Sequence, residues 1–131
     1  MRNEFTFQDA PTPGFARQHG VRLSGPGRLS LLDNLGDPTA SRAERYVYDA
    51  GARTARLVGS YGSNPAVTAQ LGGTTQPLAG GRTLVAFGNG GRVEEYDALG
   101  TVVWRIDGNS GYVFRASRIR SLYFPGVGTP R

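Results

Sequence analysis

His19 is the residue best suited to chemistry in this sequence, because it is the only histidine and the chain has no cysteine. A neutral imidazole, with a pKa of about 6.5, can act as a nucleophile or as a proton carrier near neutral pH. His19 stands in the segment Arg17-Gln18-His19-Gly20, just before a predicted strand. A lone histidine is more often a surface or hydrogen-bonded residue, so its type alone does not establish a function.

The other polar residues match no established metal or catalytic motif. One histidine without cysteine cannot supply the three or four ligands of a zinc site, and a Walker loop needs a lysine, which the chain lacks. Gly108–Gly111 is one residue too short for a nucleophile elbow and predicts a hairpin turn. Asp33, Asn34 and Asp37 offer oxygens to calcium, but their spacing favours turn residues. We therefore expect no metal and no cofactor.

The basic residues are all arginine, and they give the chain a formal net charge of +5. Such a charge can attract nucleic acid or small anions. The arginines are scattered along the chain, and the densest group is Arg115, Arg118 and Arg120. This scatter argues against a nucleic-acid partner and favours small anions.

Short runs of β-branched and aromatic residues between glycine, proline, asparagine and aspartate predict an all-β chain. No stretch keeps the helical period long enough to predict a helix. The predicted strands are Phe5–Phe7, Val21–Leu23, Leu29–Asp33, Glu44–Tyr48, Thr54–Tyr61, Thr74–Leu78, Thr83–Phe87, Val93–Tyr96, Val102–Ile106, Tyr112–Ala116 and Ile119–Phe124.

The strands repeat as a unit. Leu29–Asn34 realigns with Leu84–Asn89, and Tyr48-Asp49 realigns with Tyr96-Asp97. Each unit contains a strand, a glycine-rich turn, a strand, a loop, a strand ending in Tyr-Asp, a turn and a last strand. Four antiparallel strands in this order are typical of one blade of a β-propeller.

The repeat predicts a partial propeller of about two and a half to three blades. Residues 15–62 form the first blade, residues 69–108 the second and residues 112–124 part of a third. Residues 1–14 are an N-terminal strand and linker, and residues 125–131 are a tail. Since propellers close with about four or more blades, we expect a longer propeller or a homodimer that completes one.

Several segments resemble the bacterial arylsulfotransferases. Gln18-His19-Gly20, followed by a strand, a turn and Leu29–Asn34, is similar to a Gln-His element that precedes a Leu-x-Leu-Phe-Asp-Asn-Gly strand in that family. Gly20 stands where the family usually has aspartate or threonine. Further segments that are similar to the family, in the family's order, are Ser41–Tyr46, Thr54–Val58, Gly73–Gly88 and Tyr112–Ala116.

The resemblance implies the C-terminal half of a propeller that moves a sulfuryl group from a phenolic sulfate to a phenol, without a nucleotide donor. It implies that His19 is the nucleophile and becomes transiently sulfated, and that Arg115 stabilises the sulfuryl oxygens. The implied partners are a phenolic sulfate donor and a phenol acceptor. Histidines and an arginine that the family carries on earlier blades have no counterpart in this chain.

The sequence contains no apolar run of the roughly 18 residues that a membrane span needs. Its first residues also lack the apolar core of a signal peptide, so the residues assign no compartment, while the family resemblance is compatible with an extracytoplasmic one. Two other functions fit the same fold, since propellers serve many purposes. One is a non-catalytic module that binds a partner across its blade ends, and the other is an arginine-rich anion binder.

Overall fold

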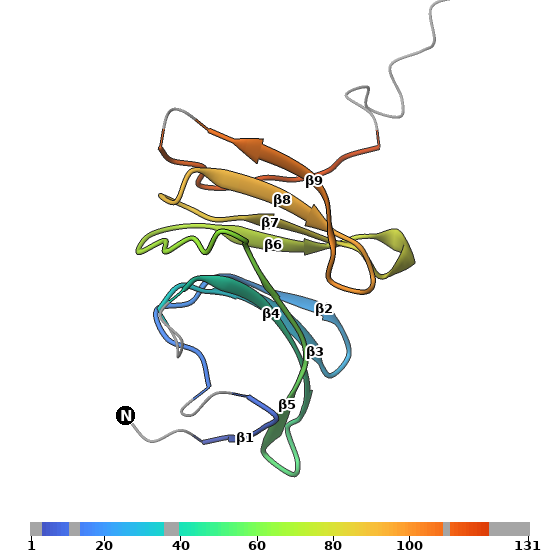
Figure 1. Ribbon diagram of the computed structural model, residues 1–131. Coiled ribbons are helices and arrows are strands. Elements are labelled where there is room, and N and C mark those ends of the chain that lie inside the picture. The colour runs from blue at the N-terminus through green and yellow to red at the C-terminus, as the bar shows by residue number, and fades with distance from the viewer. Residues whose placement is uncertain (1–3, 11–13, 36–39, 109–110, 121–131) are drawn as a thin grey trace, which may run out of the picture.

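The protein is all-β, as predicted. The computed structural model describes residues 4–10, 14–35, 40–108 and 111–120, and the nine strands found there form two sheets (Figure 1). The first sheet contains β1 (Thr6–Gln8), β2 (His19–Gly25), β3 (Arg28–Asp33), β4 (Arg42–Asp49) and β5 (Thr54–Gly62). The second contains β6 (Thr74–Pro77), β7 (Thr83–Ala86), β8 (Arg92–Tyr96) and β9 (Val102–Asp107), with a short 3-10 turn, η1 (Ala79–Gly81).

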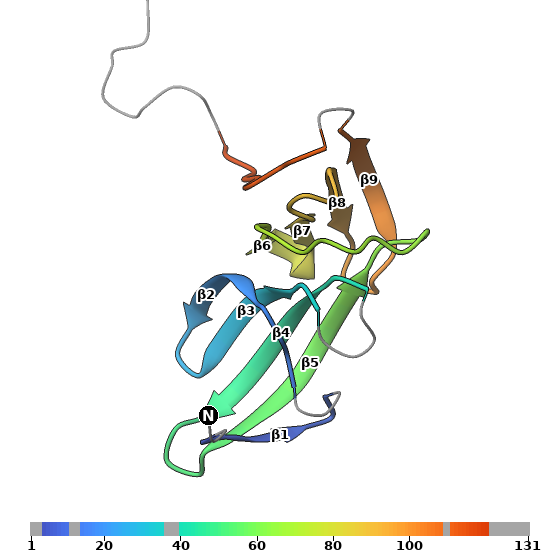
Figure 2. The same ribbon diagram turned by 90° about the vertical axis from the view of Figure 1, so that its left-hand side faces the viewer.

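Each sheet contains a four-stranded antiparallel meander, which is consistent with two blades of a partial propeller. The strand orders are β1-β5-β4-β3-β2 and β6-β7-β8-β9. The first strands of the two meanders, β2 and β6, are in contact, whereas β1 and β9 lie on opposite sides of the molecule (Figures 1 and 2). No helix in the described segments is long and apolar enough to cross a membrane.

Two segments differ from the sequence prediction. β1, which the repeat set apart from the first blade, joins its sheet by pairing in parallel with β5. The predicted strand Tyr112–Ala116 does not form, and only Val113 makes an isolated bridge, to Gly88. Ile119 and Arg120 are not in a strand, and the rest of the predicted strand up to residue 124 lies outside the described residues.

The buried side chains form three clusters because both faces of each sheet are covered. The central cluster joins Leu32, Ala43 and Tyr61 of the first sheet to Val85, Phe87 and Tyr96 of the second. A second cluster covers the outer face of the first sheet and includes Leu31, Tyr46, Phe7 and Phe15. A third covers the outer face of the second sheet and includes Leu84, Val93, Val113 and Ala116.

β4 carries a buried Arg-x-Glu-x-Tyr triad. Arg42 Nε donates to Glu44 Oε1 at 2.7 Å, and the Tyr46 hydroxyl donates to Glu44 Oε2 at 2.6 Å. Arg42 Nη2 also bonds to the buried Asp33 at 3.0 Å. Burial raises the pKa of the Glu44 carboxyl, although its two hydrogen bonds act in the opposite direction. Burial, together with the adjacent Glu44, also raises the pKa of Tyr46 far above its usual range.

β8 repeats the Arg-x-Glu-x-Tyr pattern as Arg92, Glu94 and Tyr96, but Arg92 bonds to Asp107 instead of to Glu94. Glu94 is fully buried and accepts hydrogen bonds from the Tyr96 hydroxyl, from Arg105 Nε at 2.7 Å and from Ser63 Oγ at 2.9 Å. The triads show that the structural equivalent of Tyr96 is Tyr46. The predicted alignment of Tyr48 with Tyr96 was therefore two residues out of register.

We expect Tyr46→Phe to lower the free energy of unfolding by about 1.5–3 kcal/mol, because it removes a donor from a buried carboxylate. Tyr48→Phe is the matched control on the same strand. The Tyr48 hydroxyl has no hydrogen bond to a described residue, so its loss should change stability by less than about 0.5 kcal/mol. Urea denaturation of both variants measures the difference. Equal losses would contradict a stabilising role for the triad.

Candidate functional site

His19 is the first residue of β2 and pairs with Leu32 of β3. β2 lies beside β6, so the half-buried imidazole is near the junction of the two sheets. The preceding Arg17 adopts a left-handed conformation, with φ of +51°. This bend places the Arg17 carbonyl oxygen 3.0 Å from His19 Nδ1.

Asn34 holds the imidazole from the other side. It directly follows β3 and is fully buried. Its amide nitrogen donates to the carbonyl oxygens of Ala69 and Gly72, at 2.9 and 3.1 Å. These two acceptors fix the orientation of the amide, so Oδ1 faces His19 Nδ1 at a distance of 2.9 Å.

The two contacts determine the tautomer of neutral His19. Both partners of Nδ1, the Arg17 carbonyl and Asn34 Oδ1, are acceptors, so Nδ1 must carry the proton. Nε2 is then left with the lone pair, and it has no hydrogen-bond partner among the described residues. The arrangement therefore makes Nε2 the nucleophilic atom of this imidazole.

Gly20 lets the histidine segment approach the second sheet. A Cβ at this position would lie 2.8 Å from the carbonyl oxygen of Gly73 and 2.9 Å from Cα of Thr74. Gly20 also has a φ of +60°, which favours glycine. A residue with a side chain at this position would therefore clash with the backbone at the start of β6.

Arg115 lies in a segment that bonds to Gly73 and Thr74, the two residues that Gly20 approaches. Phe114 accepts a hydrogen bond from Gly73 N at 3.2 Å, and Ala116 N donates to Thr74 Oγ1 at 3.4 Å. Arg115 itself is exposed and has no hydrogen bond or ion pair within the described segments. The fold thus brings the segments of His19 and Arg115 to the same two residues, without a bond between the two side chains.

Of the two aspartates interpreted as turn residues, Asp33 has structural partners. Asp33 accepts from Ala16 N at 2.9 Å and pairs with Arg42, whereas Asp37 lies outside the described residues. Within the described part of the chain, no three His, Cys, Asp or Glu side chains gather as ligands for a metal.

The chain also matches the model of a protein family. The family model described as Arylsulfotransferase (ASST) matches residues 3–109. The chain belongs to the arylsulfotransferase family. This match includes His19, Asn34 and both sheets of the arylsulfotransferase chain, and it ends before Arg115. No curated protein and no solved structure matches the chain. Family membership supports a sulfotransferase-like function in general.

Sequence reasoning missed Asn34, which it interpreted only as a turn residue. The available signal was the repeat, because Asn34 and Asn89 end the two segments that realign. The two asparagines differ in their contacts. Asn89 Oδ1 accepts from the backbone of Gln70 and Leu71, at 2.8 and 3.1 Å, and does not touch the histidine.

We expect Asn34→Ala to shift the proton of neutral His19 from Nδ1 towards Nε2, because Nδ1 loses one of its two acceptors. The ¹⁵N chemical shifts of the single histidine, recorded on the neutral ring, report the tautomer. Asn89→Ala is the matched control, since it removes two hydrogen bonds from the backbone to an asparagine side chain that does not touch His19. An unchanged tautomer in folded Asn34→Ala would show that Asn34 does not fix it.

Proposed function

We propose that this protein transfers a sulfuryl group from a phenolic sulfate to a phenol through a sulfated His19. The observation that carries the proposal is the hydrogen bonding of Nδ1 to two oxygens, which leaves Nε2 as the free nucleophile. Family membership supports the same class of reaction.

In the first step, the Nε2 lone pair forms a bond to sulfur while the bond from sulfur to the phenolic oxygen breaks. The leaving phenolate takes a proton from water. Positive charge develops on the ring, and the Nδ1–H bonds to Asn34 Oδ1 and the Arg17 carbonyl stabilise it. The orientation of the ring is set before the reaction, so no reorganisation is needed at this point.

In the second step, the acceptor phenol returns a proton to the solvent, and its oxygen attacks the same sulfur. The bond between nitrogen and sulfur breaks, and its electron pair returns to Nε2. Negative charge spreads over the sulfuryl oxygens in both steps, as it does in phosphoryl transfer. We assign Arg115 to these oxygens, because it is exposed, has no ion pair to a described residue and follows the segment beside Gly73 and Thr74.

Incubation with 4-nitrophenyl sulfate should add one sulfuryl group to the protein, on the peptide that contains His19. His19→Gln should abolish both the adduct and the release of 4-nitrophenol. Peptide mass spectrometry after a rapid denaturing quench measures the adduct. Its absence from a protein shown to be folded by circular dichroism would overturn the proposal and favour the non-catalytic binding module.

The same assay distinguishes a specific role of Arg115 from a general effect of positive charge on the rate. Arg115→Gln should slow adduct formation by about 100-fold, the typical effect of removing one donor from a developing oxyanion. Arg120→Gln removes an equal charge from an exposed arginine nearby and should leave the rate unchanged. Equal rates in both variants would exclude the role of Arg115 but not that of His19.

We also propose that two copies of the chain pair around a two-fold axis, with the first sheet of each facing the second sheet of the other. The outer face of the first sheet carries an apolar cavity of about 260 Å³, lined in part by Leu23, which is 73% exposed. Ile106 of β9 is 50% exposed and pairs with Val93 of the outer cluster on the second sheet. Each face therefore presents apolar surface to a partner.

Sedimentation equilibrium should give twice the chain mass of 14.0 kDa. Leu23→Asp and Ile106→Asp should each shift the protein to monomer, because each places a charge in one of the two apposed faces. Leu99→Asp is the control, since Leu99 is 92% exposed in the turn between β8 and β9. A folded wild-type protein that sediments only as a monomer would rule out this dimer.

A further inference from the structure

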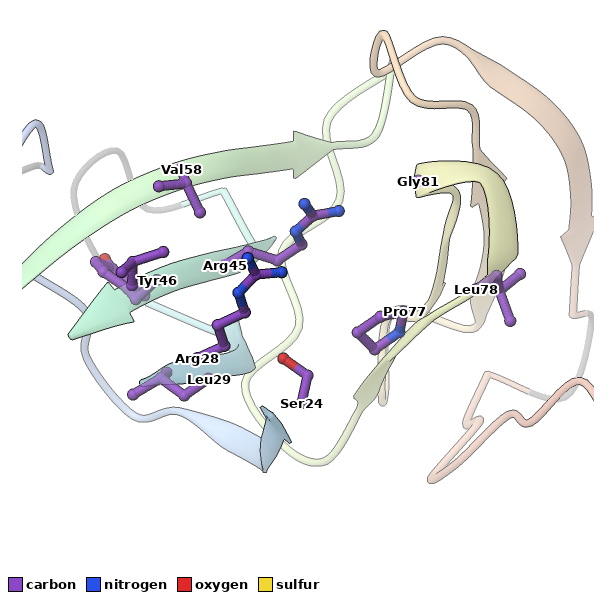
Figure 3. A pocket seen from close by; sticks show the side chains of 10 residues that line it. Ser24, Arg28, Leu29, Arg45, Tyr46, Val58, Pro77, Leu78 and Gly81 are labelled. Carbon is purple, nitrogen blue, oxygen red and sulfur yellow. The ribbon is translucent and has the colours of Figure 1, made fainter. Parts of the chain in front are cut away.

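A groove lies between the two sheets, at the end of the β2–β3 hairpin that is opposite to His19. His19 pairs with Leu32 at one end of β2 and β3, whereas Gly25 pairs with Arg28 at the other end. The groove has a volume of about 360 Å³ (Figure 3). The residues that line it are Ser24, Arg28, Leu29, Arg45, Tyr46, Val47, Val58, Pro77, Leu78 and Gly81.

Two guanidinium groups enter this groove from neighbouring strands. Arg28 of β3 pairs with Val47 of β4, and Arg45 lies two residues before Val47, so the two arginines are diagonal neighbours on one face. Figure 3 shows both side chains extending into the groove. Long side chains at diagonal positions can reach the same ligand.

No carboxylate in the groove neutralises the two arginines, because none of its lining residues is acidic. Arg45 donates to the Tyr61 hydroxyl at 3.1 Å and lies over the Tyr61 ring, which fixes its position without neutralising it. Arg28 has no hydrogen bond or ion pair to a described residue. Two like charges held close together repel each other, and an anion between them removes that repulsion.

Ser24 adds a hydroxyl donor to the two arginines, because it also lines the groove.

We propose that this groove binds a small organic anion with a tetrahedral oxyanion head, such as a sulfonate or a sulfate ester. The head lies between Arg28 and Arg45, whose planar donor groups match such oxygens. The apolar body lies against Val47, Val58 and Pro77. The site is separate from His19 and does not depend on the transfer reaction proposed above.

Naphthalene-2-sulfonate tests the proposal, because its carbon–sulfur bond gives it no sulfuryl group to transfer. Isothermal titration should show binding to the wild type that is at least 10-fold weaker in Arg28→Gln and in Arg45→Gln. Arg120→Gln, which removes an exposed arginine outside the groove, should bind like the wild type. Inorganic sulfate and 2-naphthoate should both bind more weakly than the sulfonate, since the first lacks the apolar body and the second lacks the tetrahedral head.

Backbone amide shifts in the wild type locate the ligand, and circular dichroism confirms that each variant is folded. Changes at Ser24, Val58 and Leu78 support the groove. Changes confined to His19 and Asn34, or equal affinities in all three arginine variants, would overturn the proposal. Equal affinity for naphthalene-2-sulfonate and inorganic sulfate would overturn the part of it that concerns the apolar body.

Discussion

The burial of charged residues inside the β-sheets is the constraint on which the rest of the structure depends. A carboxylate in a packed interior costs several kcal/mol unless it is paired and hydrogen-bonded. Glu44 and Glu94 are both fully buried, and each is bonded to a tyrosine two residues later and to an arginine. These bonds require the side chains to lie on one face, which selects the register of the strands that carry them.

The same constraint extends to the candidate site through two consecutive residues. Asp33 pairs with Arg42 of the buried triad and also accepts from Ala16 N, so it anchors the segment that leads to His19. Asn34 receives a hydrogen bond on its backbone oxygen from Ser41 and donates to Ala69 and Gly72 of the connection between the sheets. The position of the imidazole and its tautomer therefore depend on both sheets being packed together.

The sequence predicts the strands well because turn chemistry separates them. Asp97, for example, accepts from the backbone of Leu99 and Thr101 and closes the predicted turn before β9. The misalignment of Tyr48 with Tyr96 has a physical cause, since β4 continues beyond Tyr46 to Asp49, whereas β8 ends at Tyr96. The parallel pairing of β1 and the role of Asn34 depend on contacts between distant residues, so local sequence patterns do not reveal them.

The fold gives several arginines that are far apart in the sequence the same structural role, which is to pair with buried glutamates. Arg42 and Arg105 neutralise the buried Glu44 and Glu94, and further ion pairs link Arg82 and Arg118 to the buried Glu95. These arginines pair with carboxylates of the interior, so their charge is neutralised locally. Other arginines, among them Arg28, Arg45 and Arg115, have no ion pair to a described residue. The fold thus uses part of the positive charge to stabilise buried carboxylates and leaves the rest without such a role.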